Sequence, residues 1–209
     1  LLDYIVVLSK PNKYIMNNIE IIKSNFEENQ KINTLSSEHL LESIANATQK
    51  ILAMLKNSGT LLTCGNGGSS GDAQHIASEF INRFEIERKS LPAVSLNSDT
   101  ATITSISNDY GYKYVFSKQI SAIGTASDIL MPFTTSGNSE NILDAISTAK
   151  AKGMSVILIS GCDGGKAIDL LDENDFKVIV PSNRTSRIQE IHLIIIHSIC
   201  ECIDSYLST

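Results

Sequence analysis

The spacing of apolar residues along the chain changes near residue 60. Before it, apolar side chains recur at intervals of a helical turn, at Leu40, Leu41, Ile44, Ile51 and Leu55. This spacing predicts two helices over residues 12 to 57, broken within "NTLSSEH" at 33–39. Ser36 or Ser37 is a candidate N-cap of the second helix, because a serine hydroxyl can accept a hydrogen bond from a free N–H group.

After residue 60, short apolar runs alternate with longer helical segments. The runs cover residues 60–64, 92–96, 128–133, 155–160 and 176–181. Near-continuous apolar strands separated by helices are typical of a parallel sheet covered on both faces. The pattern therefore predicts an α/β protein with a doubly wound five-stranded parallel sheet, followed by a long isoleucine-rich helix over residues 184–207.

Neither an internal repeat nor a linker divides the 209 residues, so the pattern predicts a single domain. Within it we expect an N-terminal helical arm over residues 1–35 and the α/β domain over residues 36–209. The longest apolar runs are too short to cross a bilayer, and no leader of charged, apolar and small residues opens the chain. We therefore expect a cytoplasmic protein without a membrane partner.

The net charge of −6 argues against a nucleic-acid partner, which usually requires clustered lysines and arginines. It does not exclude anionic small molecules, because backbone N–H groups can bind a phosphate on an acidic protein. The cysteines form no C-x-x-C pair, which predicts reduced thiols. They are Cys64, Cys162, Cys200 and Cys202.

Two polar loops follow strands of the expected sheet: "GNGGS" at 65–69 and "TTSGNS" at 134–139. In doubly wound sheets, ligands bind beyond the carboxyl ends of the strands. Glycines let the backbone approach a ligand, and helix N-termini offer unpaired N–H groups. Neither loop matches the P-loop or the dinucleotide motif GxGxxG, and either one alone is explained by an ordinary turn. Both together, on alternate turns of one sheet, predict a phosphate-monoester site.

Two expected helices carry residue types suited to metal binding and proton transfer. His75 and Glu79 are four apart on the helix after the first loop, so they share one face. Gln189 and His197 are eight apart on the last helix, about 12 Å along its axis. Two histidines, a glutamate and a glutamine could surround Zn²⁺. Because eight residues is a long span for one ion, either a second subunit supplies a ligand or the set divides between metal and proton transfer.

Five stretches in order along the chain carry a family resemblance. They are "CGNGGSSGDAQHIASE", "SNDYGYKYVFSKQ", "TSGNSENILDAI", "DGGK" and "RIQEIHLIIIH". Together they resemble the phosphoheptose isomerases of the sugar isomerase (SIS) superfamily, over about residues 36 to 204. The resemblance implies a flavodoxin-like SIS domain, a homotetramer with sites between subunits, and zinc. It also implies conversion of D-sedoheptulose 7-phosphate to D-glycero-D-manno-heptose 7-phosphate, the first step toward the heptose of bacterial lipopolysaccharide or another surface polysaccharide.

The resemblance also gives roles to individual residues. Family zinc ligands fall on His75, Glu79, Gln189 and His197, with one ion in each subunit. Glu79 matches the general base and His197 its acid–base partner, while Glu79 and Gln189 also match substrate contacts. The other substrate positions belong to the first loop, to a polar pair that holds sugar hydroxyls and to a phosphate cradle: Asn66, Gly67, Gly68, Ser69, Asn108, Asp109, Thr134, Thr135, Ser136 and Ser139.

Two positions depart from the family pattern. The cradle commonly begins with serine, whereas Thr134 stands here and keeps the hydroxyl. Many members carry Asp-Arg at the start of the last motif, whereas this chain has Ser186 and Arg187, so a family carboxylate is missing there.

The residue types suit ketose–aldose isomerisation. This reaction takes a proton from the carbon beside a carbonyl and returns it to the former carbonyl carbon, through an enediolate rich in charge at two oxygens. A carboxylate, a histidine and a cation or N–H donors at the oxygens form a minimal set. We expect Glu79 to take the C1 proton, His197 to serve the oxygens, and zinc to hold both residues and the substrate.

A binding protein is the alternative. The stretches "INRFEIERKSLPAVSLNSD" and "VPSNRTSRIQE" also resemble the replication-initiator-associating protein of the same superfamily, a tetramer with this fold and no established isomerase role. That relative lacks equivalents of Glu79 and His197, whereas this chain keeps both, which favours the enzyme. A transcription regulator with an SIS domain is disfavoured, because no helix-turn-helix segment of the usual size precedes the expected sheet.

Overall fold

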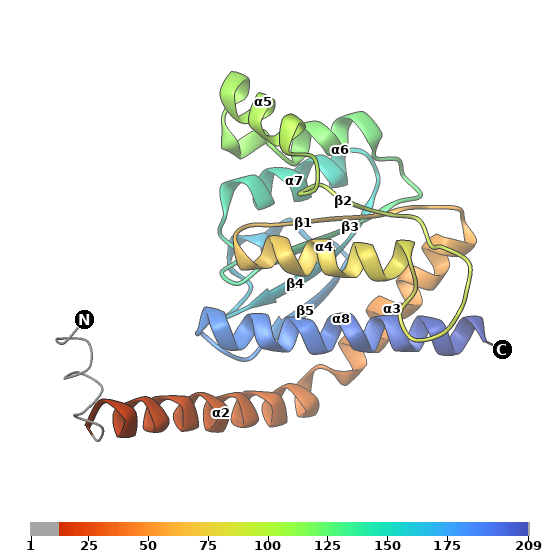
Figure 1. The fold of residues 1–209 in the computed structure, drawn as a ribbon. Helices are drawn as coiled ribbons and strands as arrows, with labels where there is room; N and C mark the ends of the chain where they lie inside the picture. Colours follow the sequence, from red (N-terminus) through yellow and green to blue (C-terminus); the bar gives the residue numbers. More distant parts are fainter. Residues whose placement is uncertain (1–12, 209) are drawn as a thin grey trace, which may run out of the picture.

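The centre of the protein is a parallel sheet, which a computed structural model describes together with the rest of residues 13–208. Its strands lie in the order β2-β1-β3-β4-β5, and every neighbouring pair is parallel (Figure 1). The strands are β1 (Leu61–Gly65), β2 (Ala93–Ser95), β3 (Ile129–Thr134), β4 (Ser155–Gly161) and β5 (Phe176–Val180). The predicted α/β fold with a five-stranded parallel sheet is therefore confirmed.

Helices cover both faces of the sheet (Figure 1). On one face lie α3 (Leu41–Lys56), α4 (Gly68–Ile81) and α8 (Thr185–Leu207). On the other lie α5 (Thr100–Tyr110), the short helix η1 (Tyr112–Tyr114), α6 (Ser117–Ile123), α7 (Glu140–Ala151) and the short helix η2 (Gly165–Leu170). Successive strand residues point to opposite faces, so Leu61 joins one apolar core and Leu62 the other. The predicted last helix is also confirmed.

The chain breaks between its first two described helices at Leu40, later than the sequence predicts. Helix α2 (Lys13–His39) includes both serines that were candidate N-caps. Ser37 Oγ instead donates to the carbonyl of Thr34, at 2.7 Å, and Ser36 Oγ is buried with no hydrogen-bond partner among residues 13–208. The N-cap prediction is wrong, because a hydroxyl that bonds back to the preceding turn lets the helix continue.

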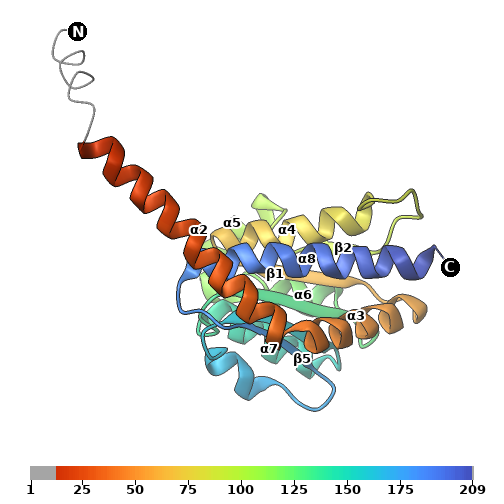
Figure 2. The ribbon, with the colours of Figure 1, turned by 90° about the horizontal axis from the view of Figure 1, so that it is seen from below.

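Helix α2 projects away from the body of the protein (Figure 2). Its middle turns are tied to the start of α8, where Asn29 Nδ2 donates to Glu190 Oε2 at 2.6 Å and Arg184 pairs with Glu28. Six of the described large apolar side chains of α2 are more than half exposed, among them Met16 and Ile21. The other four follow one another at a spacing of four, three and four residues: Ile15, Ile19, Ile22 and Phe26. The division of the chain after residue 35 stays a prediction, and residues 1–12 of the arm lie outside the described residues.

None of the helices described within residues 13–208 combines the length and the apolar character that a membrane span requires.

Candidate active site

A cavity of about 290 Å³ opens at the carboxyl ends of β1 and β3. Its lining brings together both predicted loops, the start of α8 and a side chain of β3: Asn66, Gly67, Gly68, Ser69, Phe133, Thr134, Thr135, Ser136, Ser139, Thr185 and Gln189. Nine of these residues are predicted from the sequence, and Phe133 and Thr185 are not. Among the described residues, no charged side chain lines the cavity.

The first loop is held close to α8 by its glycines. Gly67 adopts a φ of 53°, and α4 begins at the next residue. A Cβ atom on Gly68 would lie 2.5 Å from Nε2 of Gln189. A side chain at position 68 would therefore displace the Gln189 amide from this place. Asn97 supports the loop from β2's side, since its side chain accepts from Gly65 N–H at 3.0 Å and donates to Gly65 O at 2.9 Å.

A reciprocal pair of amides joins the two loops. Asn66 and Asn141 exchange side-chain hydrogen bonds, each of 2.8 Å, and Tyr112 Oη donates to Asn66 Oδ1 at 3.0 Å. Sequence reasoning missed Asn141 and Tyr112. A partial signal was present for Asn141, since it is an amide in the first turn of the helix that follows the second loop.

The second loop ends at the N-terminus of α7, where Ser139 is the N-cap. Its hydroxyl makes no capping hydrogen bond within the described chain, so the first N–H groups of α7 remain available to an anion. Thr134 is buried, and its Oγ1 accepts from Gly137 N–H at 3.2 Å. The loop therefore combines free N–H groups with hydroxyls, the donors that suit a phosphate.

Three of the four predicted metal ligands lie in a second cluster, further along α4 and α8. His75 Nε2 is 3.3 Å from Glu79 Oε1. The ring of His197 lies edge-to-face against that of His75, with centroids 5.0 Å apart, and is stacked on Phe84 at 5.5 Å. An imidazole from the last helix and a carboxylate from α4 thus meet around His75.

The fourth predicted ligand lies elsewhere. Gln189 precedes His197 by two turns of α8 and lines the cavity instead. Across the described part of the chain, no three His, Cys, Asp or Glu side chains are arranged as ligands of one metal ion. The donors His75, Glu79 and His197 have the nitrogen and oxygen chemistry that zinc prefers, and the zinc site stays a prediction.

The predicted sugar-binding pair, Asn108 and Asp109, does not reach the cavity. Both residues are exposed at the end of α5, and Asn108 Nδ2 donates to Asp109 Oδ1 at 2.8 Å. Their role in substrate binding stays a prediction.

Known proteins are similar to this chain in sequence and in fold. Residues 25–161 match the model of the SIS domain family. A phosphoheptose isomerase of Alteromonas mediterranea is 49% identical over 90% of this chain and 96% of its own length. The chain belongs to the phosphoheptose isomerase family. Another member, from Alkalilimnicola ehrlichii, is 48% identical over 92% of this chain and 98% of its own length.

Two solved structures agree with this assignment. Phosphoheptose isomerase from Neisseria gonorrhoeae superposes with a TM-score of 0.85 at 42% identity, and covers 89% of this chain and 98% of its own. The enzyme from Francisella tularensis gives a TM-score of 0.88 at 40% identity, over 90% of this chain and 98% of its own. As a member of the phosphoheptose isomerase family, the protein is an isomerase of a sugar phosphate.

A buried polar pair lies between the cavity and the histidine cluster. His192 is fully buried. Its Nδ1 lies 3.3 Å from Asp72 Oδ2, and its Nε2 lies 3.4 Å from the carbonyl of Ser160. These contacts join α8 to α4 and to the end of β4, between the cavity and the histidine cluster.

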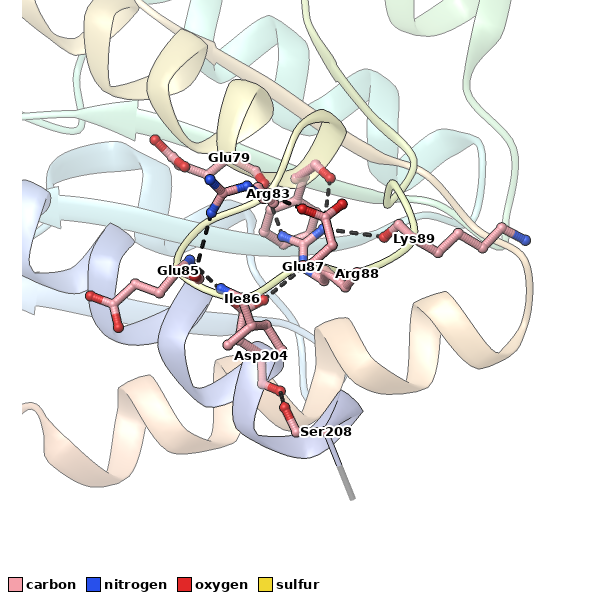
Figure 3. Close-up of polar contacts among 10 residues, drawn as sticks. Glu79, Arg83, Glu85, Ile86, Glu87, Arg88, Lys89, Asp204 and Ser208 are labelled. Atoms are coloured by element: carbon pink, nitrogen blue, oxygen red, sulfur yellow. Dashed lines mark hydrogen bonds and ion pairs between the residues drawn. The ribbon is translucent and has the colours of Figure 1, made fainter.

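A buried ion pair fixes the end of α4, close to Glu79 (Figure 3). Arg88 Nη2 donates to the carbonyl of Glu79 at 2.9 Å, and Arg88 Nε donates to Asp204 Oδ1 at 2.6 Å. The N–H groups of Glu85 and Ile86 donate to Asp204 Oδ2 at 3.1 and 3.3 Å. Burial alone would raise the pKa of Asp204, but the hydrogen bonds from Arg88 and the two N–H groups outweigh it, so that pKa lies below its ordinary value.

The thiols of this phosphoheptose isomerase are free. Burial raises the pKa of Cys64 far above its ordinary range. Burial, with a smaller effect of the Glu79 carboxylate, raises the pKa of Cys200 to about 12. Because the thiolate is the reactive form, neither of these two cysteines is a nucleophile at neutral pH.

Proposed function

We propose that the protein interconverts D-sedoheptulose 7-phosphate and D-glycero-D-manno-heptose 7-phosphate in the cytoplasm, and so supplies heptose for a bacterial surface polysaccharide. The observation that carries the proposal is the convergence of two hydroxyl-lined loops in one cavity. The helices that border this cavity, α4 and α8, also carry the cluster of Glu79 and His197. The names of the relatives support the choice of a heptose phosphate.

The cavity holds the phosphate end of the substrate in this proposal. The free N–H groups at the start of α7 and the hydroxyls of Thr135, Ser136 and Ser139 bind the phosphate oxygens, and the positive end of the helix dipole adds to the attraction. Gln189 and Asn66 bind sugar oxygens. Binding energy from this remote end fixes the sugar chain for reaction.

Glu79 and His197 carry out the proton transfers. The Glu79 carboxylate takes the proton from C1 and returns it at C2, and the His197 imidazole moves a proton between the two oxygens. A zinc ion, one per subunit, would be held by His75, Glu79 and His197, and when bound it supplies charge stabilisation at the substrate oxygens. Gln189, the fourth predicted ligand, acts on the substrate in this assignment.

A proton-exchange assay tests the function. Purified protein is given D-sedoheptulose 7-phosphate in D₂O, with and without a chelator, and exchange at C1 is followed by NMR. We expect exchange that the chelator abolishes and added zinc restores, because the enediolate forms only when its oxygens are stabilised. Exchange that persists in chelator would remove the metal from the proposal. The alternative binding protein predicts no exchange in either sample.

We also propose that the protein is a homotetramer with sites between subunits. The four apolar residues of α2 have the alternating four- and three-residue spacing of a helix that packs along another helix. A second exposed apolar patch, Leu193 and Ile194, lies one turn from His197 on α8. A subunit packed there would adjoin the histidine cluster, which a single chain leaves partly open to solvent.

The exchange of Phe26 for glutamate tests the assembly. Phe26 is 75% exposed, so the change costs the monomer little, whereas a charge in a packed helix seam is unfavourable. We expect Phe26→Glu to reduce the mass measured by light scattering from four subunits to fewer. The control is Lys23→Gln, at a charged and exposed position of the same helix, which keeps four. A Phe26→Glu protein that remains tetrameric would show that this seam does not hold the subunits together.

A further inference from the structure

The "DGGK" stretch, residues 163–166, is a family motif without a role in the proposed reaction. It follows β4 and leads into η2. Residues 163–167 do not line the cavity but contact the second loop, whose residues Thr134, Thr135, Ser136 and Ser139 do.

Two hydrogen bonds join this turn to the second loop, and a third lies within the loop. Ala167 N–H donates to Gly137 O at 3.0 Å, and Lys166 N–H donates to Asn138 Oδ1 at 3.1 Å. The same Asn138 side chain donates through Nδ2 to Ser136 O at 2.8 Å. Asn138 therefore links the backbone of the turn to the backbone of a residue that lines the cavity.

The two backbones also meet through glycines with positive φ. A Cβ atom on Gly137, at φ +65°, would lie 1.8 Å from Gly164 O. A Cβ atom on Gly165, at φ +55°, would lie 2.3 Å from Ser136 O and 2.7 Å from Asn138 Nδ2. Neighbouring backbone atoms lie so close to Gly137 and Gly165 that neither position has room for a side chain. The positive φ values are a second, independent reason for glycine at both positions.

We infer that the turn at residues 163–167 is a positioning element, which holds the second loop in its phosphate-binding shape before the substrate arrives. The inference rests on the proposed function, because it needs the second loop to bind phosphate. A loop that is ordered in advance loses less conformational entropy on binding, and its affinity for the ligand is higher for that reason. Disturbing the turn weakens the hold on the phosphate group and leaves Glu79 and His197 in place.

Gly165→Ala is the principal test, with Gly164→Ala as its matched control. Both positions have positive φ, so both substitutions carry the same kind of backbone strain. The new Cβ at residue 165 points at Ser136 O, whereas at residue 164 it would meet the side chain of Ile168, at 2.3 Å from Cδ1. We expect Gly165→Ala to raise KM for the phosphosugar and the inhibition constant of inorganic phosphate together, by roughly tenfold, with kcat changed less than about twofold. Gly164→Ala changes both constants less.

Asn138→Ala keeps the test decisive if Gly165→Ala does not fold. It introduces no positive φ and removes both bonds that Asn138 makes, so the same joint rise is expected. Asn138→Asp keeps an acceptor for Lys166 N–H and recovers part of the affinity. Calorimetry with inorganic phosphate measures the binding without turnover.

Two results would overturn the inference, and they differ. If phosphate binds the wild-type protein and both Gly165→Ala and Asn138→Ala leave its affinity unchanged, the turn does not position the loop, while the proposed function stands. If phosphate neither binds the wild-type protein nor competes with the phosphosugar, the cradle itself is wrong, and the proposed function loses its main support.

Discussion

Glu79→Gln is expected to lower kcat by about three orders of magnitude and to leave KM for the phosphosugar close to its original value. Glutamine keeps the size of the side chain and its hydrogen bonding but cannot accept the C1 proton, and general-base catalysis contributes roughly 10²- to 10⁴-fold. In the proposed function the phosphate end binds in the cavity, which Glu79 does not line, so ground-state binding is expected to persist. Steady-state kinetics and proton exchange at C1 both measure the loss.

The matched control is Glu87→Gln, which makes the same chemical change on a glutamate whose side chain is 90% exposed. We expect its kcat to equal that of the wild type. A Glu79→Gln enzyme that retained more than about a tenth of the original turnover would show that another group takes the proton.

Arg88→Met is expected to lower the free energy of unfolding by about 3–5 kcal/mol, because it leaves a buried carboxylate without its partner. The Arg88 and Asp204 side chains are 6% and 4% exposed, so water does not replace the lost pair. Denaturant unfolding measures the change. Arg83→Met is the control, since Arg83 pairs with Glu87 at the surface and such pairs contribute roughly 0–1 kcal/mol.

A double substitution tests whether the unpaired Asp204 carboxylate, rather than another effect of Arg88→Met, causes the loss of stability. Arg88→Met together with Asp204→Leu removes both charges and is expected to recover a large part of the loss, since a buried pair can be replaced by apolar groups at little cost. If the double variant is no more stable than Arg88→Met, the unpaired carboxylate is not the cause.

The pH dependence of stability provides a second test of the Arg88–Asp204 pair. The pKa of Asp204 lies below its ordinary value of 3.8, so its contribution to stability is fully present above pH 3.8 and is lost as the pH falls through the lowered pKa. The wild-type protein therefore loses this contribution only below about pH 3.8. In Arg88→Met the largest of the hydrogen bonds that lower this pKa is absent, so the pKa of Asp204 rises and the carboxylate contributes less to stability above pH 3.8.

The sheet was predictable because its strands are buried on both faces. β1 and β3 carry no exposed residue, so they appear in the sequence as unbroken apolar runs, and their predicted and observed bounds differ by one residue. The helix break was not predictable from local residues. Helix α2 ends just before Leu40, where no side chain of the described residues makes a capping hydrogen bond. Ser36 and Ser37 instead suggested an earlier end of the helix.

The cavity was predictable for a related reason. Both loops follow strands of a parallel sheet, and parallel strands bring their carboxyl ends to one edge. The contacts of Asn66 with Tyr112 and Asn141 span 46 and 75 residues, and the Arg88–Asp204 pair spans 116. No local pattern predicts pairings at such separations, and isolated charged residues in a sequence are usually at the surface.

The uncharged lining of the cavity has a consequence for salt tolerance. Lysine and arginine sites lose affinity for phosphate as ionic strength rises, since mobile ions screen their attraction. Here the described cavity offers hydroxyls and N–H groups, whose short hydrogen bonds are screened little. Salt screens instead the long-range repulsion between a phosphate and the protein's net charge of −6. In the proposed function, concentrated salt therefore leaves the binding of a phosphorylated sugar in this cavity largely intact.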